Sequence, residues 1–326
     1  MDAQAIASGD RRALSRAVTL VESTRPDHRK AAAALLDALA PLGRHAMRIG
    51  LTGTPGVGKS TFVEALGLHL LERGLSVAVL AVDPSSARTG GSILGDKTRM
   101  ERLARHPRAF VRPSPAAREL GGVARRTRES AALLEGAGFD VLLVETVGVG
   151  QSETAVTEVS DLFALLIAPG GGDELQGVKR GIMEAADLVL VNKADGALAD
   201  AARHTRADYA GALRLMRPRP GDPDGYPMAL AVSAATGAGL AEAWDAIRAL
   251  HAHRDAAGAL GRLRAGQARR WFEEEVRRGL LDAALSDPGR AERMAALGRA
   301  VEAGGTSPAA AAREVLAGVD RPGGDP

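Results

Sequence analysis

The sequence predicts an α/β protein built on a doubly wound, mainly parallel sheet, with helical segments before and after it. Short apolar runs alternate with helical patterns through the middle of the chain, and some are almost continuously apolar, such as VLLV at 141–144 and LVLV at 188–191. Strands of that composition are typical of parallel sheets covered by helices on both faces. With 326 residues, 45% of them hydrophobic, the chain can bury a large core.

Residues 1–44 are expected to form a helical extension. Asp10 is well placed to cap a first helix, and Pro26-Asp27 begins a second. Apolar side chains recur at helical spacing in both segments, at Ala13, Leu14, Ala17, Val18 and Val21, and then at Leu35, Leu36 and Leu39.

Residues 45–250 are expected to hold the sheet as a P-loop domain. Strand patterns occur at 46–51, 76–82, 140–144, 162–168, 187–191 and 228–232. From Leu240 onward no strand pattern remains, and residues 251–326 are expected to be a helical arm. Its helices are predicted at 271–285, 288–302 and 308–318, the last with Ser307 as cap and Pro308 in the first turn.

Composition argues against several classes of protein. The formal net charge is only +2 and aromatic residues are 3%, which favours neither a phosphate-backbone footprint nor base stacking, so no nucleic-acid partner is expected. The run RRTR at 125–128 is interpreted as a solvated helix face rather than a basic patch. The chain has no cysteine, no signal-peptide pattern and no run near the ~18 apolar residues of a membrane helix. A cytoplasmic protein without a membrane partner is therefore expected.

The segment GTPGVGKS at 53–60 matches the phosphate-binding motif G-x-x-x-x-G-K-[ST] and lies between a strand pattern and a helix pattern. Glycines let backbone N–H groups close around phosphates, and the helix N-terminus adds positive potential. Lys59 is expected to reach the β- and γ-phosphates, and the Ser60 hydroxyl to bind Mg²⁺. The residues expected to contact the phosphates are Gly53, Gly56, Val57, Gly58, Lys59, Ser60 and Thr61.

The tetrapeptide NKAD at 192–195 follows LVLV and resembles the guanine-reading N-K-x-D motif of GTPases. The Asp195 carboxylate only accepts hydrogen bonds, which suits the N1–H and 2-amino donors of guanine and mismatches adenine. The Lys193 stem can lie along the base, and Asn192 can brace the loops. Ser233-Ala234, in SAATGAGL at 233–240, resembles the second guanine loop. Together with the phosphate loop, these segments predict GTP and GDP as ligands.

A third segment, VLLVETVGVGQSE at 141–153, lies where GTPases usually carry D-x-x-G and reads Glu145-x-x-Gly148. A carboxylate after a buried strand can position Mg²⁺ or its water, and the Gly148 N–H can sense the γ-phosphate. Val149 stands where small GTPases place the glutamine that orients water, so intrinsic hydrolysis is expected to be slow. The role of Gln151 stays open.

Two acidic residues and one glycine-rich segment complete the candidates. Asp83 and Asp96 can each approach the metal, with helix capping as the alternative for Asp83 and a surface loop for Asp96. The segment 169–181 is polar and lies between two strand patterns. Such loops sense a nucleotide or a partner, or serve as plain connectors.

These segments, taken in order, resemble the MeaB/MMAA family of G-protein chaperones, sometimes labelled ArgK or transport-system ATPases. The matching stretches are GTPGVGKST, AVDPSS, GSILGDKTRM, ETVGVGQSE, GDELQGVKRGIMEAADL and NKAD. RALSRAVTLVES at 12–23 is also similar to the family's N-terminal helix, whereas the C-terminal arm matches only loosely.

The resemblance implies a G domain of the SIMIBI class, a homodimer formed through the C-terminal arm, and GTP hydrolysis. It implies an adenosylcobalamin-dependent acyl-CoA mutase as client, such as methylmalonyl-CoA mutase. Hydrolysis would gate delivery of intact cofactor and removal of damaged cofactor. It further implies metal-linked roles for Asp83, Asp96 and Glu145, catalytic roles for Lys59 and Glu145, and a third switch at 169–181 that includes Lys179.

Two other classes stay open. An ATP-dependent kinase or transport-associated ATPase shares the phosphate loop, but Asp195 mismatches adenine. A nickel-type metallochaperone GTPase shares the G-domain class, but the chain has no cysteine and its seven histidines are scattered.

Overall fold

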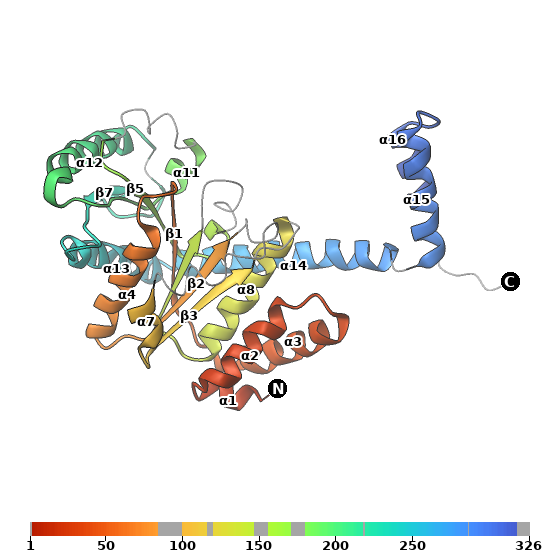
Figure 1. The fold of residues 1–326 in the computed structure, drawn as a ribbon, viewed down its shortest axis with the longest axis horizontal. Coiled ribbons are helices and arrows are strands. Elements are labelled where there is room, and N and C mark those ends of the chain that lie inside the picture. Colours follow the sequence, from red (N-terminus) through yellow and green to blue (C-terminus); the bar gives the residue numbers. More distant parts are fainter. Residues whose placement is uncertain are drawn as a thin grey trace. The chain divides into compact units, whose positions relative to one another are not determined.

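The computed structural model describes residues 2–83, 100–115, 120–146, 156–170, 180–217, 219–285 and 287–317. The structure divides into two compact units, residues 1–264 and 265–326 (Figure 1). Inside these ranges, the side chains of 83, 114, 115, 120–124, 180, 284 and 285 are not described.

A seven-stranded parallel sheet forms the centre of the first unit, in the order β3-β2-β4-β1-β5-β6-β7. This confirms the expected fold class, and every strand pattern noted in the sequence forms a strand, with small shifts at the ends. The strands are β1 (Met47–Gly53), β2 (Val77–Asp83), β3 (Ala109–Pro115), β4 (Val141–Thr146), β5 (Leu162–Ile167), β6 (Leu188–Val191) and β7 (Met228–Ala231).

The strand that the sequence did not predict is β3. Its sequence, AFVRPSP, contains Pro113 and Pro115, which have no N–H to donate to a neighbouring strand. A central strand could not tolerate this. β3 lies at the edge of the sheet and pairs with β2 alone. On its outer side there is no neighbouring strand that would need the missing N–H groups.

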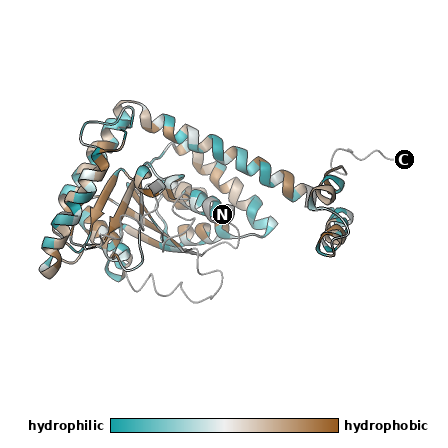
Figure 2. Ribbon diagram, turned by 90° about the horizontal axis from the view of Figure 1, so that it is seen from above, coloured by the Kyte–Doolittle hydropathy of each residue, from teal (hydrophilic) through white to brown (hydrophobic). Residues whose placement is uncertain are grey.

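Helices cover both faces of the sheet, and most strand residues between them are hydrophobic (Figure 2). On one face, α4 (Lys59–Glu72), α7 (Glu101–Arg105) and α13 (Leu240–Ala256) share a core with alternate strand residues such as Ile49, Leu51 and Leu143. On the other, α8 (Leu120–Gly136) packs on β2, and α12 (Ala199–Arg214) packs on β6 and β7. The remaining short helices are α11 (Arg180–Ala185) and η2 (Gly196–Leu198).

The N-terminal extension forms α1 (Ala3–Ala7), α2 (Arg11–Glu22), α3 (Pro26–Leu39) and η1 (Ala40–Leu42). Asp10 caps α2 as expected, accepting from the N–H groups of Arg12 and Ala13. Helices α2 and α3 pack on α8, and Arg29 pairs with Glu129 at 2.5 Å.

That packing overturns one expectation. Thr127 and Arg128 of the RRTR run are buried, so the prediction of a solvated face at 125–128 is wrong. The reason is that α8 contacts the sheet as well as α2 and α3, and so has little surface left for water.

The second unit is helical. Helix α14 (Ala259–Leu285) begins well before the expected 271–285 and crosses the boundary between the units. It is followed by α15 (Pro288–Glu302) and α16 (Pro308–Ala317), which pack together. Ser307 caps α16 as expected, since the Ala310 N–H donates to its Oγ at 3.2 Å. Within the described ranges, no helix is long and apolar enough to cross a bilayer.

Candidate nucleotide-binding site

The phosphate-loop motif lies at the carboxyl end of β1, in the middle of the sheet. β1 runs parallel to its neighbours β4 and β5, so the three strands end at the same edge. After Gly53 the chain turns through residues 54–58 into α4, and Gly58 at the helix N-cap has a φ of 90°. A helix N-terminus at the carboxyl edge of a parallel sheet favours an anionic ligand.

Lys59, the first residue of α4, turns back onto the loop that precedes it. Its Nζ donates to the carbonyl oxygens of Gly53 at 2.7 Å and Thr54 at 3.0 Å. The residue is 8% exposed. The loop therefore encloses a fixed positive charge, as phosphate binding requires.

The Ser60 hydroxyl and the Glu145 carboxylate meet beside the loop. Ser60 Oγ donates to Glu145 Oε1 at 2.9 Å, and Glu145 lies opposite Leu51 at the end of β4 with 1% exposure. A hydroxyl and a carboxylate oxygen are ligands that suit Mg²⁺, which commonly takes one or two protein oxygens and completes its shell with phosphate and water. Outside this pair, the described residues contain no group of three or more acidic or histidine side chains arranged for a metal.

Four expected site residues cannot be placed in this geometry. Asp83 ends β2, next to β4, but its side chain is not described. Asp96, Gly148 and Lys179 lie outside the described residues.

The Asn192 side chain joins the phosphate loop to the loop after β7. Its Nδ2 donates to the Val57 carbonyl at 3.0 Å, and its Oδ1 accepts from the Ala234 N–H at 3.1 Å. The residue is 1% exposed, so both ends of the amide are satisfied by backbone. The segment that follows β6 is thereby fixed against the segments that follow β1 and β7.

Lys193 and Asp195 extend this arrangement outward. Lys193 has a φ of 59°, rare for a non-glycine residue, and its Nζ donates to the Gly56 carbonyl at 2.8 Å. Asp195 Oδ1 accepts from Ser233 Oγ at 2.6 Å, and the Thr236 N–H donates to the same hydroxyl at 3.1 Å. The carboxylate is oriented by Ser233 and keeps lone pairs for a ligand's donors.

Two further residues at this edge were not singled out from the sequence. Thr52 and Thr146 end the apolar parts of β1 and β4, and their Oγ1 atoms are 2.7 Å apart. A single polar residue at a strand end is a common feature. Their pairing depends on the register of two strands distant in the sequence, so no local pattern predicted it.

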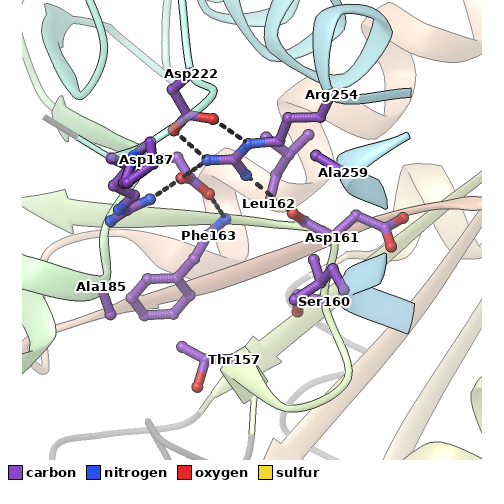
Figure 3. A pocket seen from close by; sticks show the side chains of 13 residues that line it. Thr157, Ser160, Asp161, Leu162, Phe163, Ala185, Asp187, Asp222, Arg254 and Ala259 are labelled. Carbon is purple, nitrogen blue, oxygen red and sulfur yellow. Dashed lines mark hydrogen bonds and ion pairs between the residues drawn. The ribbon is translucent and has the colours of Figure 1, made fainter. Parts of the chain in front are cut away.

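A cavity of about 310 Å³ lies at the opposite edge, by the amino ends of β5 and β6 (Figure 3). Arg254 there donates to Asp187 at 2.6 Å and to Asp222 at 2.7 Å. Burial opposes the charge of Arg254, but these bonds outweigh it and raise the pKa above its usual value. Arg219 also pairs with Asp187. The lining residues are Thr157, Ser160, Asp161, Leu162, Phe163, Ala185, Asp187, Arg219, Pro220, Asp222, Arg254, Ala259 and Leu263.

The cavity is not the nucleotide site. Its two lining arginines are already paired with carboxylates, which leaves no cation among the described lining residues to receive a phosphate. The lysines, the helix N-terminus and the NKAD segment all lie at the other end of the strands.

Comparison with known proteins gives matches over most of the chain. A family model described as methylmalonyl-CoA mutase-associated GTPase MeaB matches residues 14–289. A probable GTPase of Mycobacterium tuberculosis is 53% identical over 96% of this chain and 93% of its own length. A mouse protein named methylmalonic aciduria type A homolog, mitochondrial, is 44% identical over 95% of this chain and 77% of its own length. The solved structure of an LAO/AO transport system kinase has 36% identity and a TM-score of 0.73, covering 98% of this chain and 96% of that one.

Gly58 lies so close to the Asn192 amide that a side chain at this position would displace it. A Cβ on Gly58 would lie 2.9 Å from Asn192 Nδ2, at a φ of 90° that L-residues rarely adopt. Gly58→Ala should lower the free energy of unfolding by about 1–3 kcal/mol and weaken GDP binding at least about tenfold, because the amide that braces the loop must move. Thermal unfolding and calorimetric titration with GDP measure the two effects.

Gly221→Ala is the matched control. Gly221 has a nearly equal φ of 88°, and nothing lies within 4 Å of its Cβ position. This variant should show backbone strain without loss of GDP affinity. Equal GDP affinities for Gly58→Ala and the wild type would contradict the bracing role of Asn192.

Proposed function

Because the chain belongs to the family of methylmalonyl-CoA mutase-associated GTPases, MeaB, we propose that it is a G-protein chaperone for a B12-dependent acyl-CoA mutase. GTP hydrolysis gates adenosylcobalamin loading, protection and reactivation of that client. The mutase in the family description and the name of the mouse relative support the client. In the chain itself, the central observation is a phosphate loop bonded directly to a base-reading segment through Asn192 and Lys193.

The phosphates of GTP are assigned to the loop at 53–58 and the first turn of α4. Gly53, Gly56, Val57, Gly58 and Thr61 would contribute backbone groups, and Lys59 would exchange its two carbonyl partners for phosphate oxygens. The ammonium is already enclosed by the loop, so little reorganisation is needed to place its charge beside the transferred phosphoryl group.

Mg²⁺ is assigned to Ser60 and Glu145, with Asp83 and Asp96 as further acidic groups from the sequence. When bound, the ion would neutralise charge on the β- and γ-phosphates. Ser60 and Glu145 are within hydrogen-bonding distance of each other, so the fold itself brings these two oxygens together. Gly148 is assigned to the γ-phosphate on sequence grounds.

Guanine is assigned to Asp195, with Lys193 along the base and with Ser233 and Ala234 holding the second loop. Ser233 fixes the orientation of the Asp195 carboxylate, so its remaining acceptors can face the two adjacent donors of guanine. The name of the LAO/AO transport system kinase suggests a kinase as the second candidate. That function would use ATP, for which the carboxylate is a poor match.

Exchange of the Asp195 carboxylate for an amide tests base recognition. Asp195→Asn replaces one acceptor by a donor, so GTP affinity should fall by roughly 10²-fold or more while XTP, which carries an oxygen at C2, gains affinity. Competition titrations with GTP, XTP and ATP measure this. Wild-type GTP affinity with no gain for XTP would exclude the assignment, and tighter ATP than GTP binding by the wild type would favour the kinase.

A client mutase is expected to accelerate hydrolysis through Lys179. A cation supplied to the phosphoryl group is worth on the order of 10³–10⁵ in rate for an arginine finger, and less for lysine. Single-turnover GTP hydrolysis should therefore rise when purified methylmalonyl-CoA mutase is added, and Lys179→Ala should lose most of that rise but keep its basal rate and complex formation.

Lys30→Ala, a change of an exposed lysine on α3, is the matched control and should respond to mutase as the wild type does. Equal stimulation of Lys179→Ala and the wild type would show that the activating group lies elsewhere. No complex with mutase in any nucleotide state would exclude the chaperone function.

A homodimer is proposed through the apolar side chains of α14. Phe272, Val276 and Leu280 follow one another at four-residue spacing and are 68%, 44% and 68% exposed. Leu281 adds a further 58% exposed side chain, and Trp271 precedes the stripe. A row of this kind is too apolar for a helix to present to water alone, and a second copy would bury it.

Charged substitutions on that stripe should separate the dimer. In sedimentation of the full chain, Phe272→Asp/Leu280→Asp should shift the mass to the monomer, because each carboxylate would be buried without a partner. Arg278→Asp changes a residue on the opposite side of the same helix from the stripe and should leave the dimer intact. A dimeric Phe272→Asp/Leu280→Asp variant would place the interface elsewhere.

A further inference from the structure

Two threonine hydroxyls join the strands that carry the phosphate loop and Glu145, at the point where these strands stop pairing. Backbone pairing of β1 with β4 runs as far as Leu51 opposite Glu145. The next residues are Thr52 and Thr146, whose Oγ1 atoms are 2.7 Å apart. Gly53 follows Thr52 directly and is the first residue of the phosphate-loop motif. The hydroxyl pair therefore lies directly before the phosphate loop on β1 and directly after Glu145 on β4.

Burial makes the two hydroxyls dependent on each other. Thr52 is 1% exposed and Thr146 is 0% exposed, so water does not compete for their hydrogen bond. In such a pair one hydroxyl donates and the other accepts. Removing one hydroxyl deprives the other of its buried partner, whereas removing both leaves an apolar contact of nearly the same shape.

The end of β4 is held from both faces of the sheet. Successive strand residues point to opposite faces: Glu145 accepts from Ser60 of α4, while Thr146 bonds to Thr52 of β1. The position of the carboxylate is therefore fixed with respect to the helix and to the strand that carries the phosphate loop.

On the same face as Thr52, β1 also lies close to residues 156–160. Gly50 precedes Thr52 by two residues and shares its face, and a Cβ at Gly50 would lie 2.5 Å from both Val156 Cγ1 and Ser160 Oγ. Only a glycine allows so close an approach. β1 thus holds the chain that follows Glu145 at two points, Thr146 and 156–160.

We propose that Thr52 and Thr146 are positioning residues for GTP hydrolysis, which hold the Glu145 carboxylate in register with the phosphate loop. They act through Glu145 and do not touch the nucleotide. The inference rests on the proposed role of Glu145 at the hydrolytic site. The bond affects the placement of one group and leaves the phosphate and base contacts intact, so its loss should act on kcat rather than on binding.

Valine and serine variants test this, because valine keeps the shape of threonine and serine keeps its hydroxyl. Thr146→Val and Thr52→Val should each lower the single-turnover rate of GTP hydrolysis about tenfold, with GTP affinity changed by less than about twofold. Thr146→Ser and Thr52→Ser should recover most of the rate. Thr52→Val/Thr146→Val should lose no more than either single variant, since the partners act as one unit.

Ser76→Ala is the control at the opposite edge of the sheet, just before β2. Ser76 Oγ donates to Asp140 Oδ2 at 2.7 Å, next to the amino end of β4, so this variant loses a hydroxyl bond far from the nucleotide. Its hydrolysis rate should equal the wild-type rate. Circular dichroism and thermal unfolding identify any variant that fails to fold. If one valine variant does not fold, the other valine variant and the two serine variants still test the proposal.

A wild-type rate in folded Thr146→Val and Thr52→Val would overturn the proposal. Additive losses in the double variant would also overturn it, because the hydroxyls would then act separately. These assays contain no mutase, so their outcome is independent of the proposed client. Normal hydrolysis by Glu145→Gln would instead show that the assigned role of Glu145 is wrong.

Discussion

The site depends on one constraint: β1 is buried between β4 and β5, and all three strands run in the same direction. Parallel strands have their carboxyl ends at one edge, so segments from distant parts of the sequence must meet there. The phosphate loop and NKAD each follow a strand of this sheet, and Glu145 lies near the carboxyl end of β4. The apolar strand residues therefore determine where the polar residues after them can act.

The charged side chains at the two edges of the sheet have different hydrogen-bond partners. At the amino edge, Arg254 and Arg219 are paired with carboxylates, which hold the starts of β5 and β6 to neighbouring segments. At the carboxyl edge, Lys59 and Lys193 donate to backbone carbonyls of the phosphate loop. A lysine can exchange a carbonyl partner for a phosphate oxygen, whereas an arginine bonded to a carboxylate would have to give up an ion pair. The N-terminus of α4 adds positive potential at the carboxyl edge.

Much of the fold was predictable because the local patterns agreed with the global one. The cap at Asp10, the apolar runs of the inner strands and the start of α16 at Pro308 all follow from short-range rules. β3 was missed because Pro113 and Pro115 argue against a strand unless its place at the sheet edge is known. The burial of Thr127 and Arg128 was missed because it depends on α2 and α3 packing over α8.

The same distinction applies to the site. Motifs with fixed spacing, such as GTPGVGKS, identify their own ligand chemistry from the sequence alone. Sequence indicated that Asn192 would brace loops, but not that its partners are Val57 and Ala234. The Thr52–Thr146 pair had no local pattern, since only the register of β1 and β4 brings these hydroxyls together.

When nucleotide binds, Lys59 exchanges one set of hydrogen-bond partners for another. Its ammonium donates to the carbonyls of Gly53 and Thr54. A phosphate would therefore replace existing hydrogen-bond partners and would not simply add new bonds. The net gain is the difference between a bond to a charged phosphate oxygen and a bond to a neutral carbonyl oxygen, of order 1 kcal/mol per bond. In return, the buried charge is not left without a partner as nucleotide leaves. The lysine charge can therefore keep hydrogen-bond partners both with and without nucleotide.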